Sequence, residues 1–317
     1  MELIQKIKSH KKYKTLSDDI VKKELNKLLK SGHFKEPFSK NQEKTIIKKV
    51  REKLHRIYSS YQSRKKNKRE KILEELKLAV EKKAKNQIQQ TNKVEKKFVV
   101  PLSSKPIKQT QELNWFTIKG ITEKLLSLTL STKERLPYYL FIYNKIFKIT
   151  GIPKTIIDLG SGLNPVSYPY MNLSNINYYA YDIDISDIDF LNRYFYLMKK
   201  VGINGKAEIK DISTLKVDNL SKADIVFMFK LIDLIDEKKR KTSKDLMKDL
   251  FEKNKTKFIV ASFSTKTLTR KPMNLPRRIG FEKMLSLMNL KFNSFSIENE
   301  IFYVIKSLQY TSEQLQK

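Results

Sequence analysis

Hydrophobic and polar positions follow the period of helices in the first half of the chain, and from about residue 154 short apolar segments alternate with helical ones. From residue 1 to about 95 the apolar residues recur at every third or fourth position with lysines between them, as in the segment 20–29. This spacing predicts amphipathic helices over almost all of that stretch, one of them covering 43–61. Residues 82–108 lose the pattern and are rich in Lys, Gln and Asn, which is typical of a linker.

Two further helices are expected after the linker, before the period changes. One covers 113–130, and the tetrad STKE at 131–134 has the spacing of a capping box that opens the next helix. Pro137 is expected to delay that start. From residue 154 short apolar segments alternate with helical ones, as in parallel sheets covered by helices on both faces. We predict seven strands, at 155–159, 176–181, 207–210, 225–229, 258–262, 292–297 and 301–305.

The last two predicted strands lie too close together in the chain for a crossover connection, so they must form an antiparallel hairpin. A mostly parallel sheet of seven strands that ends in a hairpin is the topology of class I, Rossmann-like methyltransferases. The predicted fold class is therefore α/β, with that domain over residues 111–317. A basic, all-helical domain with a lysine-rich insertion is expected over residues 1–110.

The charge of the chain is large and uneven. Lysine and arginine exceed aspartate and glutamate by 31 over 317 residues, and 23 of these excess charges fall in residues 1–150. Such an excess repels the compact state unless a polyanion offsets it, so nucleic acid is the first partner to consider. A general abundance of lysine in the source organism is an alternative explanation, but it would not segregate the charge. The run RKKNKREK at 64–71 also suits contacts with phosphates.

Residues that the sequence lacks exclude several classes of protein. Without cysteine there is no disulfide framework, thiolate metal site or cysteine nucleophile. The three histidines, at 10, 33 and 55, lack the spacing of ligands, so no metal is expected. No apolar run approaches the roughly 18 residues of a membrane span, and the start MELIQKIKSHKK has no signal-peptide core. We expect a cytoplasmic monomer that makes no contact with membranes.

The most informative motif is KTIIDLGSGLNP, in which a strand ends at Asp158 and is followed by Gly160 and Gly162. Two glycines allow a tight turn and a close approach of the backbone to a ligand. The third glycine of a dinucleotide fingerprint is replaced by Pro165, which disfavours nicotinamide and flavin cofactors. There is no Walker loop either, so S-adenosylmethionine is the expected cofactor, and we include Asp158 and Asn164 among its candidate contacts.

Acidic residues follow the next two predicted strands. Asp182 ends the second strand, where its carboxylate can accept hydrogen bonds from both ribose hydroxyls, and Asp184 is the alternative for that role. Asp211 and Ile212 end the third strand, in position to accept from the adenine amino group and to pack on its ring. Each acid could instead cap a helix. Three acids at successive strand ends favour the cofactor interpretation.

The absent motifs also narrow the chemistry of methyl transfer. Methylation of a pyrimidine ring carbon usually needs a cysteine adduct, which this chain cannot form. Methylation of adenine or cytosine amino groups usually shows a [DN]PP[YF] tetrad after the fourth strand, whereas Phe229 is followed by KLIDLID. A purine ring nitrogen such as guanine N7 carries its own lone pair and needs no general base. The sequence therefore allows guanine N7 as the acceptor.

The chain resembles the aminoglycoside-resistance 16S ribosomal RNA (guanine-N7) methyltransferases. The resemblance lies in DLGSGLNP, YYAYDID, VFMFK, FSTKTLTRK and ENEIFYVI, and in KKYKTLSDDIV, KLHRIYSSY and STKER of the first half. It implies a helical amino-terminal domain that docks on the small ribosomal subunit, and an arginine of STKER, here Arg135, that meets the carboxylate of the cofactor. Residues 64–112 have no counterpart, and Ser161 stands where the family often has cysteine.

Basic residues at or just beyond the fourth and fifth predicted strands are candidates for positioning the substrate. They are Lys230, Lys266, Arg270 and Lys271. Ligands of open α/β sheets bind at this edge, so these cations are expected to face phosphates around an extruded base. The alternative is that strand-end lysines are simply solvated.

The sequence therefore predicts an S-adenosylmethionine-dependent RNA methyltransferase that acts on a guanine of small-subunit ribosomal RNA, at N7 and without a general base. Three alternatives stay open: an enzyme of the same fold that acts on transfer RNA, an RNA-binding assembly factor whose cofactor pocket has lapsed, and a small-molecule methyltransferase. A small-molecule methyltransferase would not explain the excess of positive charge in the first half of the chain.

Overall fold

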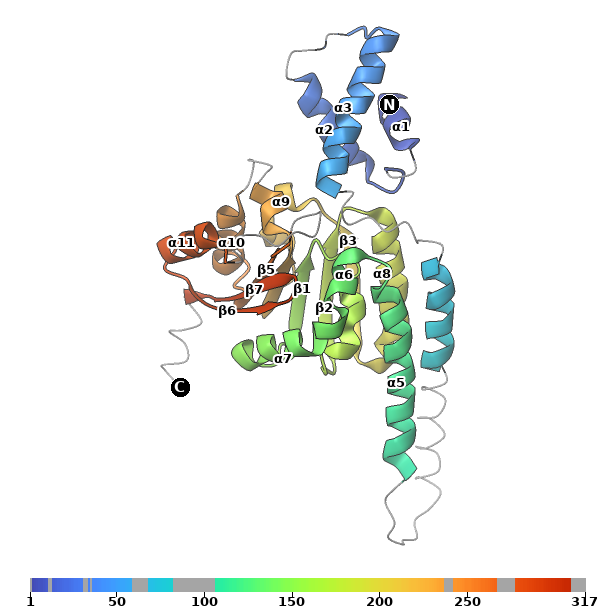
Figure 1. The fold of residues 1–317 in the computed structure, drawn as a ribbon, viewed down its shortest axis with the longest axis vertical. Coiled ribbons are helices and arrows are strands. Elements are labelled where there is room, and N and C mark those ends of the chain that lie inside the picture. Colours follow the sequence, from blue (N-terminus) through green and yellow to red (C-terminus); the bar gives the residue numbers. More distant parts are fainter. Residues whose placement is uncertain are drawn as a thin grey trace.

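The structure is a computed structural model in which a small cluster of helices at the amino terminus sits at one end of a larger sheet domain (Figure 1). It describes residues 2–10, 13–30, 34, 36–58, 68–81, 106–236, 242–266 and 277–308, with the backbone alone at 55–58, 106–114 and 213.

The sheet has seven strands in the order β3-β2-β1-β4-β5-β7-β6. The strands are β1 (Thr155–Leu159), β2 (Ile176–Asp182), β3 (Ile203–Ile209), β4 (Ile225–Phe229), β5 (Phe258–Ser264), β6 (Lys291–Ile297) and β7 (Glu300–Lys306). The first five run parallel, while β7 is antiparallel to both β5 and β6. This confirms the predicted sheet and its closing hairpin, and it places the carboxyl ends of β1 to β5 along one edge.

The third strand begins four residues before the predicted range, at Ile203 instead of Ala207. The early part of β3 contains Asn204 and Gly205, residue types that are depleted in strands and so conceal the pattern. The glycine has a packing reason, because a Cβ at that position would lie 2.1 Å from the ring of Phe195. Tertiary packing thus overrides the local preference here.

Helices cover both faces of the sheet. They are α5 (Pro106–Leu126), α6 (Leu130–Arg135), α7 (Tyr139–Thr150), α8 (Ile185–Met198), α9 (Ile232–Asp236), α10 (Ser243–Glu252) and α11 (Ile279–Leu287). One core holds apolar residues of α5, α7 and α8, and the other holds those of α9, α10 and α11. Among the described helices, none is long and apolar enough to cross a membrane.

Two expectations about the helices before the sheet are wrong. The helix predicted at 113–130 begins at Pro106, inside the expected linker, and ends at Leu126. Proline is well tolerated in the first turn of a helix, where its missing N–H has no partner to lose. The predicted capping box is also absent, because α6 already begins at Leu130, after Thr129. The delay at Pro137 is confirmed: a 3-10 turn intervenes before α7.

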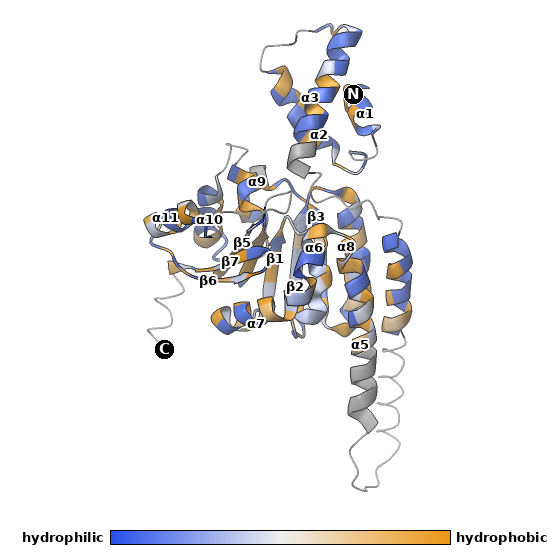
Figure 2. Cartoon of the chain, in the orientation of Figure 1, coloured by the Kyte–Doolittle hydropathy of each residue, from blue (hydrophilic) through white to orange (hydrophobic). Residues whose placement is uncertain are grey.

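The amino-terminal domain consists of α1 (Glu2–Lys8), α2 (Asp18–Leu29) and α3 (Lys40–Tyr58). These helices share a small core of their own, which includes Ile7, Val21 and Leu54, and hydrophilic residues dominate their outer faces (Figure 2). The near-continuous helicity expected over the first 95 residues is therefore wrong, because separate helices are joined by turns. Residues 59–67 and 82–105 of that prediction lie outside the described part of the chain.

A further helix over residues 68–81 lies beside α5 (Figure 1). Its Leu73, Leu76 and Val80 belong to the same core as α5, α7 and α8. Its Arg69 is 2% exposed and pairs with Asp187 of α8 at 2.5 Å. The domain division near residue 110 stays a prediction, but this helix contributes to the core of the sheet domain.

The contact between Gly205 and Phe195 gives a test of the packing. We expect Gly205→Ala to lower the free energy of unfolding by about 1–3 kcal/mol, because the added methyl overpacks the core beside α8. Gly120→Ala in α5 is the control, since a Cβ at that position would have no neighbouring atom within 4 Å, and it should raise stability by about 1 kcal/mol through helix propensity. Chemical denaturation measures both changes. Equal effects of the two substitutions would contradict the packing of β3 against α8.

Candidate functional site

A cavity opens at the carboxyl edge of the sheet, where the loops after β1, β2, β3 and β4 meet. All eight residues that the sequence predicts as cofactor contacts line it: Arg135, Asp158, Gly160, Gly162, Asn164, Asp182, Asp211 and Ile212. Residues more than 70 positions apart in the chain thus converge, as expected for parallel strands whose ends share an edge.

The glycine loop after β1 turns through two residues in the left-handed region, Gly160 at φ +66° and Gly162 at φ +47°. The N–H groups of Gly160 and Ser161 donate to the carbonyl oxygen of Tyr181, at 2.8 and 3.1 Å. A Cβ on Gly160 would lie 2.9 Å from Leu231. The positive φ and the close neighbour both require glycine at position 160. The two hydrogen bonds to Tyr181 hold the loop against the end of β2.

The carboxylate of Asp182 holds this loop in place. It accepts hydrogen bonds from the N–H groups of Gly162 at 2.8 Å, Ile183 at 2.6 Å and Asp184 at 3.2 Å. Burial raises the pKa of Asp182 to about 6, although the backbone hydrogen bonds act in the opposite direction. A carboxylate offers about four lone-pair sites, so acceptor capacity is left for a ligand.

Asp158 lies at the base of the cavity and is 1% exposed. Its Oδ2 accepts both from the amide of Asn164 at 2.9 Å and from the hydroxyl of Tyr178 at 2.7 Å. Burial raises the pKa of Asp158 to about 6, against the effect of these two donors. Asp158 therefore fixes Asn164, and through it the end of the glycine loop.

The other two strand-end acids have protein partners. Asp184 accepts from the N–H groups of Ser186 and Asp187 at the start of α8, at 2.9 and 3.2 Å, so it is a helix cap. It also accepts from the hydroxyl of Thr15 at 2.9 Å. Asp211 forms an ion pair with Lys23 of the amino-terminal domain. The cap role that the sequence left open is thus the one that Asp184 has.

A buried cluster of charges forms the wall of the cavity beside α6. The guanidinium of Arg135 donates to both carboxylate oxygens of Glu300, at 2.8 and 2.9 Å. Lys230 bonds Glu134 at 2.8 Å and lies 3.4 Å from Glu300. Burial alone would lower the pKa of Arg135, but the adjoining Glu300 outweighs it and the pKa is raised. Two cations and two anions compensate each other within this wall.

Comparison with known proteins gives the family. Residues 116–304, well over half of the chain, match the family model described as ribosomal RNA methyltransferase (FmrO). The chain belongs to the FmrO family of ribosomal RNA methyltransferases.

The relatives of this FmrO-family chain agree with that assignment. A 16S rRNA (guanine(1405)-N(7))-methyltransferase of Proteus mirabilis is 25% identical over 312 residues, which are 97% of each protein. The solved structure of the 16S rRNA methylase RmtB has a TM-score of 0.62 at 20% identity, over 96% of this chain and 97% of that one. RmtF in complex with S-adenosyl-L-homocysteine has the same score at 17% identity, over 96% and 97%. The two structures confirm the methyltransferase fold.

The lining of the cavity fits the cofactor that the sequence predicts. Ser161 has a buried hydroxyl with no hydrogen-bond partner in the described part of the chain, and a ligand in the cavity could supply one. Apolar side chains, among them Ile212, Phe229 and Leu231, also line it and suit an adenine ring. The glycines leave the backbone open to close approach. S-adenosylmethionine therefore suits these residues.

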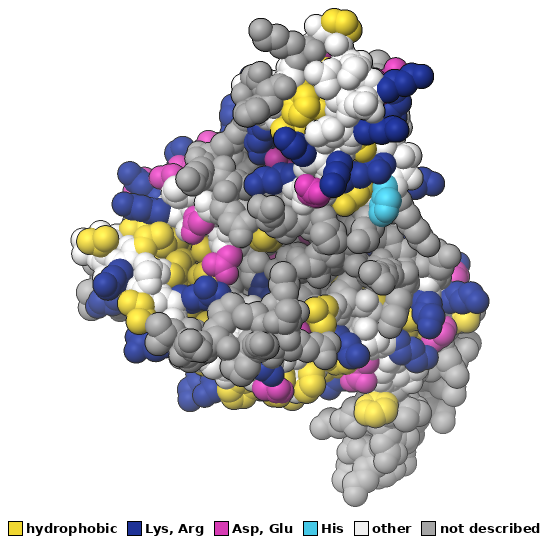
Figure 3. Space-filling model, turned by 45° about the horizontal axis from the view of Figure 1, so that its top comes forward, with side chains coloured by type: hydrophobic (Ala, Val, Ile, Leu, Met, Phe, Trp, Pro, Cys, Tyr) yellow, Lys and Arg dark blue, Asp and Glu magenta, His cyan; other side chains and the backbone are white. Residues whose placement is uncertain are grey.

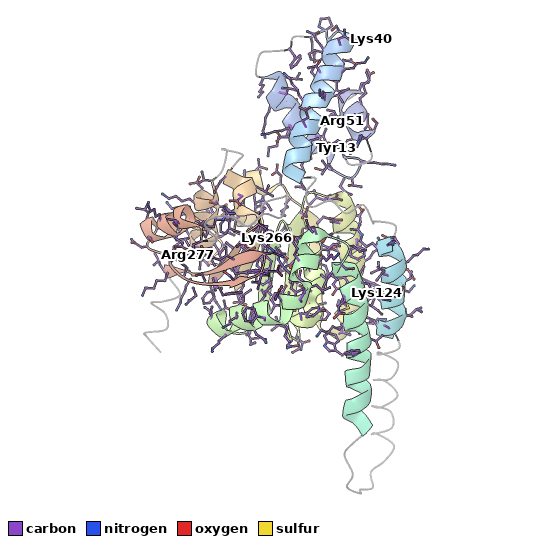
Figure 4. The ribbon with its side chains drawn as sticks, in the orientation of Figure 1. Tyr13, Lys40, Arg51, Lys124, Lys266 and Arg277 are labelled. Atoms are coloured by element: carbon purple, nitrogen blue, oxygen red, sulfur yellow. The ribbon has the colours of Figure 1, made fainter. Side chains whose placement is uncertain are left out.

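Among the candidate substrate-positioning cations, Lys230 lines the cavity. The side chain of Lys230 is 8% exposed and already paired within the wall. Lys266 bonds Glu298 at 2.8 Å and lies close to the strands (Figure 4). Arg270 and Lys271 fall outside the described residues. Contacts of these cations with RNA stay a prediction.

Sequence reasoning missed three residues at this site. Leu16 and Lys23 come from the amino-terminal domain. Leu16 lies in the segment KKYKTLSDDIV, which carries the resemblance but does not single it out, and no motif marks Lys23. Glu300 is fully buried at the start of β7, where the sequence shows an isolated acid opening an apolar strand. An acid that opens an apolar strand is a local signal of a buried ion pair, because a carboxylate that becomes buried needs a partner.

Burial of Asp158 predicts a pH dependence of stability. Its pKa is about 6 in the folded protein against an ordinary value of 3.8, so between these values the folded state binds more protons and stability falls as the pH rises. Asn at this position can accept both hydrogen bonds through its single oxygen and removes the effect. From pH 4.5 to 7.5, Asp158→Asn should gain about 2 kcal/mol in unfolding free energy relative to the natural chain.

The measurement is chemical denaturation at both pH values. Asp189→Asn, the same change at an exposed position of α8, is the matched control and should show no such gain. If both variants followed the natural chain at both pH values, the burial of a charge at Asp158 would be disproved.

The charge cluster predicts that Glu300 is structurally essential to the cavity wall. Glu300→Gln leaves the buried cations Arg135 and Lys230 with one anion, so we expect a loss of about 3 kcal/mol in unfolding free energy. Glu298→Gln, two positions away at the exposed end of the hairpin, should stay close to the natural chain. Thermal and chemical unfolding compare the two variants. A silent Glu300→Gln would be inconsistent with this cluster.

Proposed function

We propose that this chain transfers a methyl group from S-adenosylmethionine to N7 of a guanine in small-subunit ribosomal RNA. The observation that carries the proposal is the convergence of the glycine loop, Asp182 and Asp211 on one cavity in a member of a ribosomal RNA methyltransferase family. The match with a guanine(1405)-N(7) enzyme over almost the full length of both proteins supports the choice of atom.

Different residues of the cavity would contact different parts of the cofactor. Gly160 and Gly162 would lie against its ribose and methionine part, and Asp182 would accept from a ribose hydroxyl through the lone-pair site that its three backbone donors leave. Asp211 would accept from the adenine amino group while Ile212 packs on the ring. Arg135 would meet the carboxylate, as the resemblance implies. When bound, S-adenosylmethionine supplies an electrophilic methyl group.

The electrostatics of the cavity favour a cationic cofactor. Asp158 and Asp182 have pKa values of about 6 because burial disfavours their charged forms, and a nearby positive charge would favour those forms again. The cations of the wall, Arg135 and Lys230, are already compensated by glutamates. The acids that line the cavity thus supply the negative potential that a sulfonium needs. Guanine N7 attacks with its own lone pair, so no residue has to remove a proton.

The amino-terminal domain supplies a surface for ribosomal RNA. Lys40, Lys44 and Lys48 are exposed along α3, and none of them has an ion-pair partner among the described residues. Lysine and arginine side chains gather over this domain (Figure 3), and Lys40 lies at its far tip (Figure 4). Free lysines on a rigid helix suit phosphates, and their contacts weaken as salt rises. We also propose a cytoplasmic monomer, and the lining of one cavity of a single chain by all eight predicted cofactor contacts supports the monomer.

The proposal is tested by methyl transfer from tritiated S-adenosylmethionine to isolated small ribosomal subunits. We expect label in the small-subunit RNA, recovered after digestion as 7-methylguanosine by mass spectrometry. Asp182→Ala removes the acceptor of three backbone N–H groups and should lower both transfer and S-adenosylhomocysteine affinity at least about ten-fold. Asp189→Ala on the exposed face of α8 is the control that should retain both.

The same assay separates the remaining alternatives. Label in stripped transfer RNA instead of the subunit would assign another substrate to the same fold. Binding of S-adenosylhomocysteine without transfer to either RNA would favour a small-molecule methyltransferase, whereas an RNA-binding assembly factor with a lapsed pocket would not bind it. Absence of cofactor binding by calorimetry would contradict the cofactor site itself.

A further inference from the structure

The loop after β2 serves the cavity and the amino-terminal domain at the same time. Asp182 lines the cavity and holds the glycine loop. The next residue, Ile183, packs against the core of the amino-terminal domain. Asp184 then accepts from Thr15. Three consecutive residues thus connect the side of the cavity that is proposed to hold the ribose with the domain that is proposed to bind RNA.

A short extended segment of the amino-terminal domain completes this junction. Leu16 forms an antiparallel bridge with Asp184, and the carbonyl oxygen of Thr15 accepts from the N–H of Ile185 at 3.0 Å. Leu16 is fully buried and itself lines the cavity. Backbone and side-chain contacts therefore fix the segment against the rim, so the domain cannot move far without opening the cavity.

The second connection is the ion pair between Lys23 of α2 and Asp211 after β3. Both side chains are 15% exposed, so this pair is shielded from water and gains more than a surface pair would. Lys23 donates to Oδ2 of the carboxylate. Since a carboxylate has about four lone-pair sites, Asp211 can hold Lys23 and an adenine amino group together.

We propose that Lys23 is a positioning residue of the cofactor site, which orients Asp211 toward the adenine amino group and couples cofactor binding to the seating of the amino-terminal domain. This inference rests on the proposed function, because it takes the ligand of the cavity to be an adenosyl compound. Coupling of this kind is reciprocal. The bound cofactor therefore also stabilises the position in which the domain presents its lysines to RNA.

The test is the affinity of the full-length chain for S-adenosylhomocysteine, measured by calorimetry. Lys23→Met keeps the length of the side chain and removes its charge, so Asp211 loses its fixed orientation. We expect about five-fold weaker binding, the size of one shielded ion pair. Lys27→Met, one turn further along α2, is the matched control, because Lys27 pairs with Glu24 of its own helix. It should bind within two-fold of the natural chain.

A second ligand separates positioning of Asp211 from a general loss of structure. S-inosylhomocysteine carries an oxygen in place of the adenine amino group, so it cannot donate to Asp211 there. Lys23→Met should therefore weaken the binding of S-adenosylhomocysteine much more than the binding of S-inosylhomocysteine. An equal loss for both ligands would indicate a structural role and overturn the inference, as would unchanged or tighter binding of S-adenosylhomocysteine.

Thr15→Val tests the other connection independently of α2. It removes the hydrogen bond to Asp184 and loosens the loop that carries Asp182, so both ligands should bind more weakly and by the same factor. Unchanged affinities would overturn the part of the inference that concerns the loop after β2. If the natural chain bound neither ligand, the proposed function would fail together with this inference, an outcome distinct from a natural chain that binds and variants that bind equally well.

Discussion

The site depends on one partly buried carboxylate, that of Asp182, and the three backbone N–H groups that it accepts from. One of these groups belongs to the glycine loop after β1, and two belong to the loop after β2. Their hydrogen bonds lock together two segments that would otherwise expose unpaired backbone donors at the edge of the sheet. The cavity has its shape because the two loops cannot shift independently.

Buried charged groups at the carboxyl edge of the sheet are compensated in two different ways. In the wall beside α6, Arg135 and Lys230 are neutralised by Glu134 and Glu300, so the desolvation of each ion is offset by a partner. In the floor, Asp158 has only neutral donors, from Asn164 and Tyr178, and its pKa rises. A wall of paired charges and an acidic floor together favour a cationic ligand, and the proposed cofactor carries a sulfonium.

Local patterns predicted the parts of the structure that depend on a few neighbouring residues. The strands, the closing hairpin and the glycine loop belong to this group, because alternation, chain separation and positive φ act over short segments. The ion pairs of Glu300 and Lys23 could not be predicted, since each joins positions more than 160 residues apart. The start of α6 was misplaced for a smaller reason, as Thr129 and Ser131 both have side chains suited to a helix cap.

The separation of charge along the sequence has a structural consequence beyond RNA. Acids cluster at the rim of the cavity. Two of them, Asp187 in the first turn of α8 and Asp211 after β3, are partners of basic residues from the first half, Arg69 and Lys23. The basic helices of the first half are thus complementary to this acidic rim. One excess of positive charge both attaches the first half to the cofactor edge and, on the outward face of α3, stays available for nucleic acid. The junction between the domains therefore lies where the proposed function requires cofactor and substrate to meet.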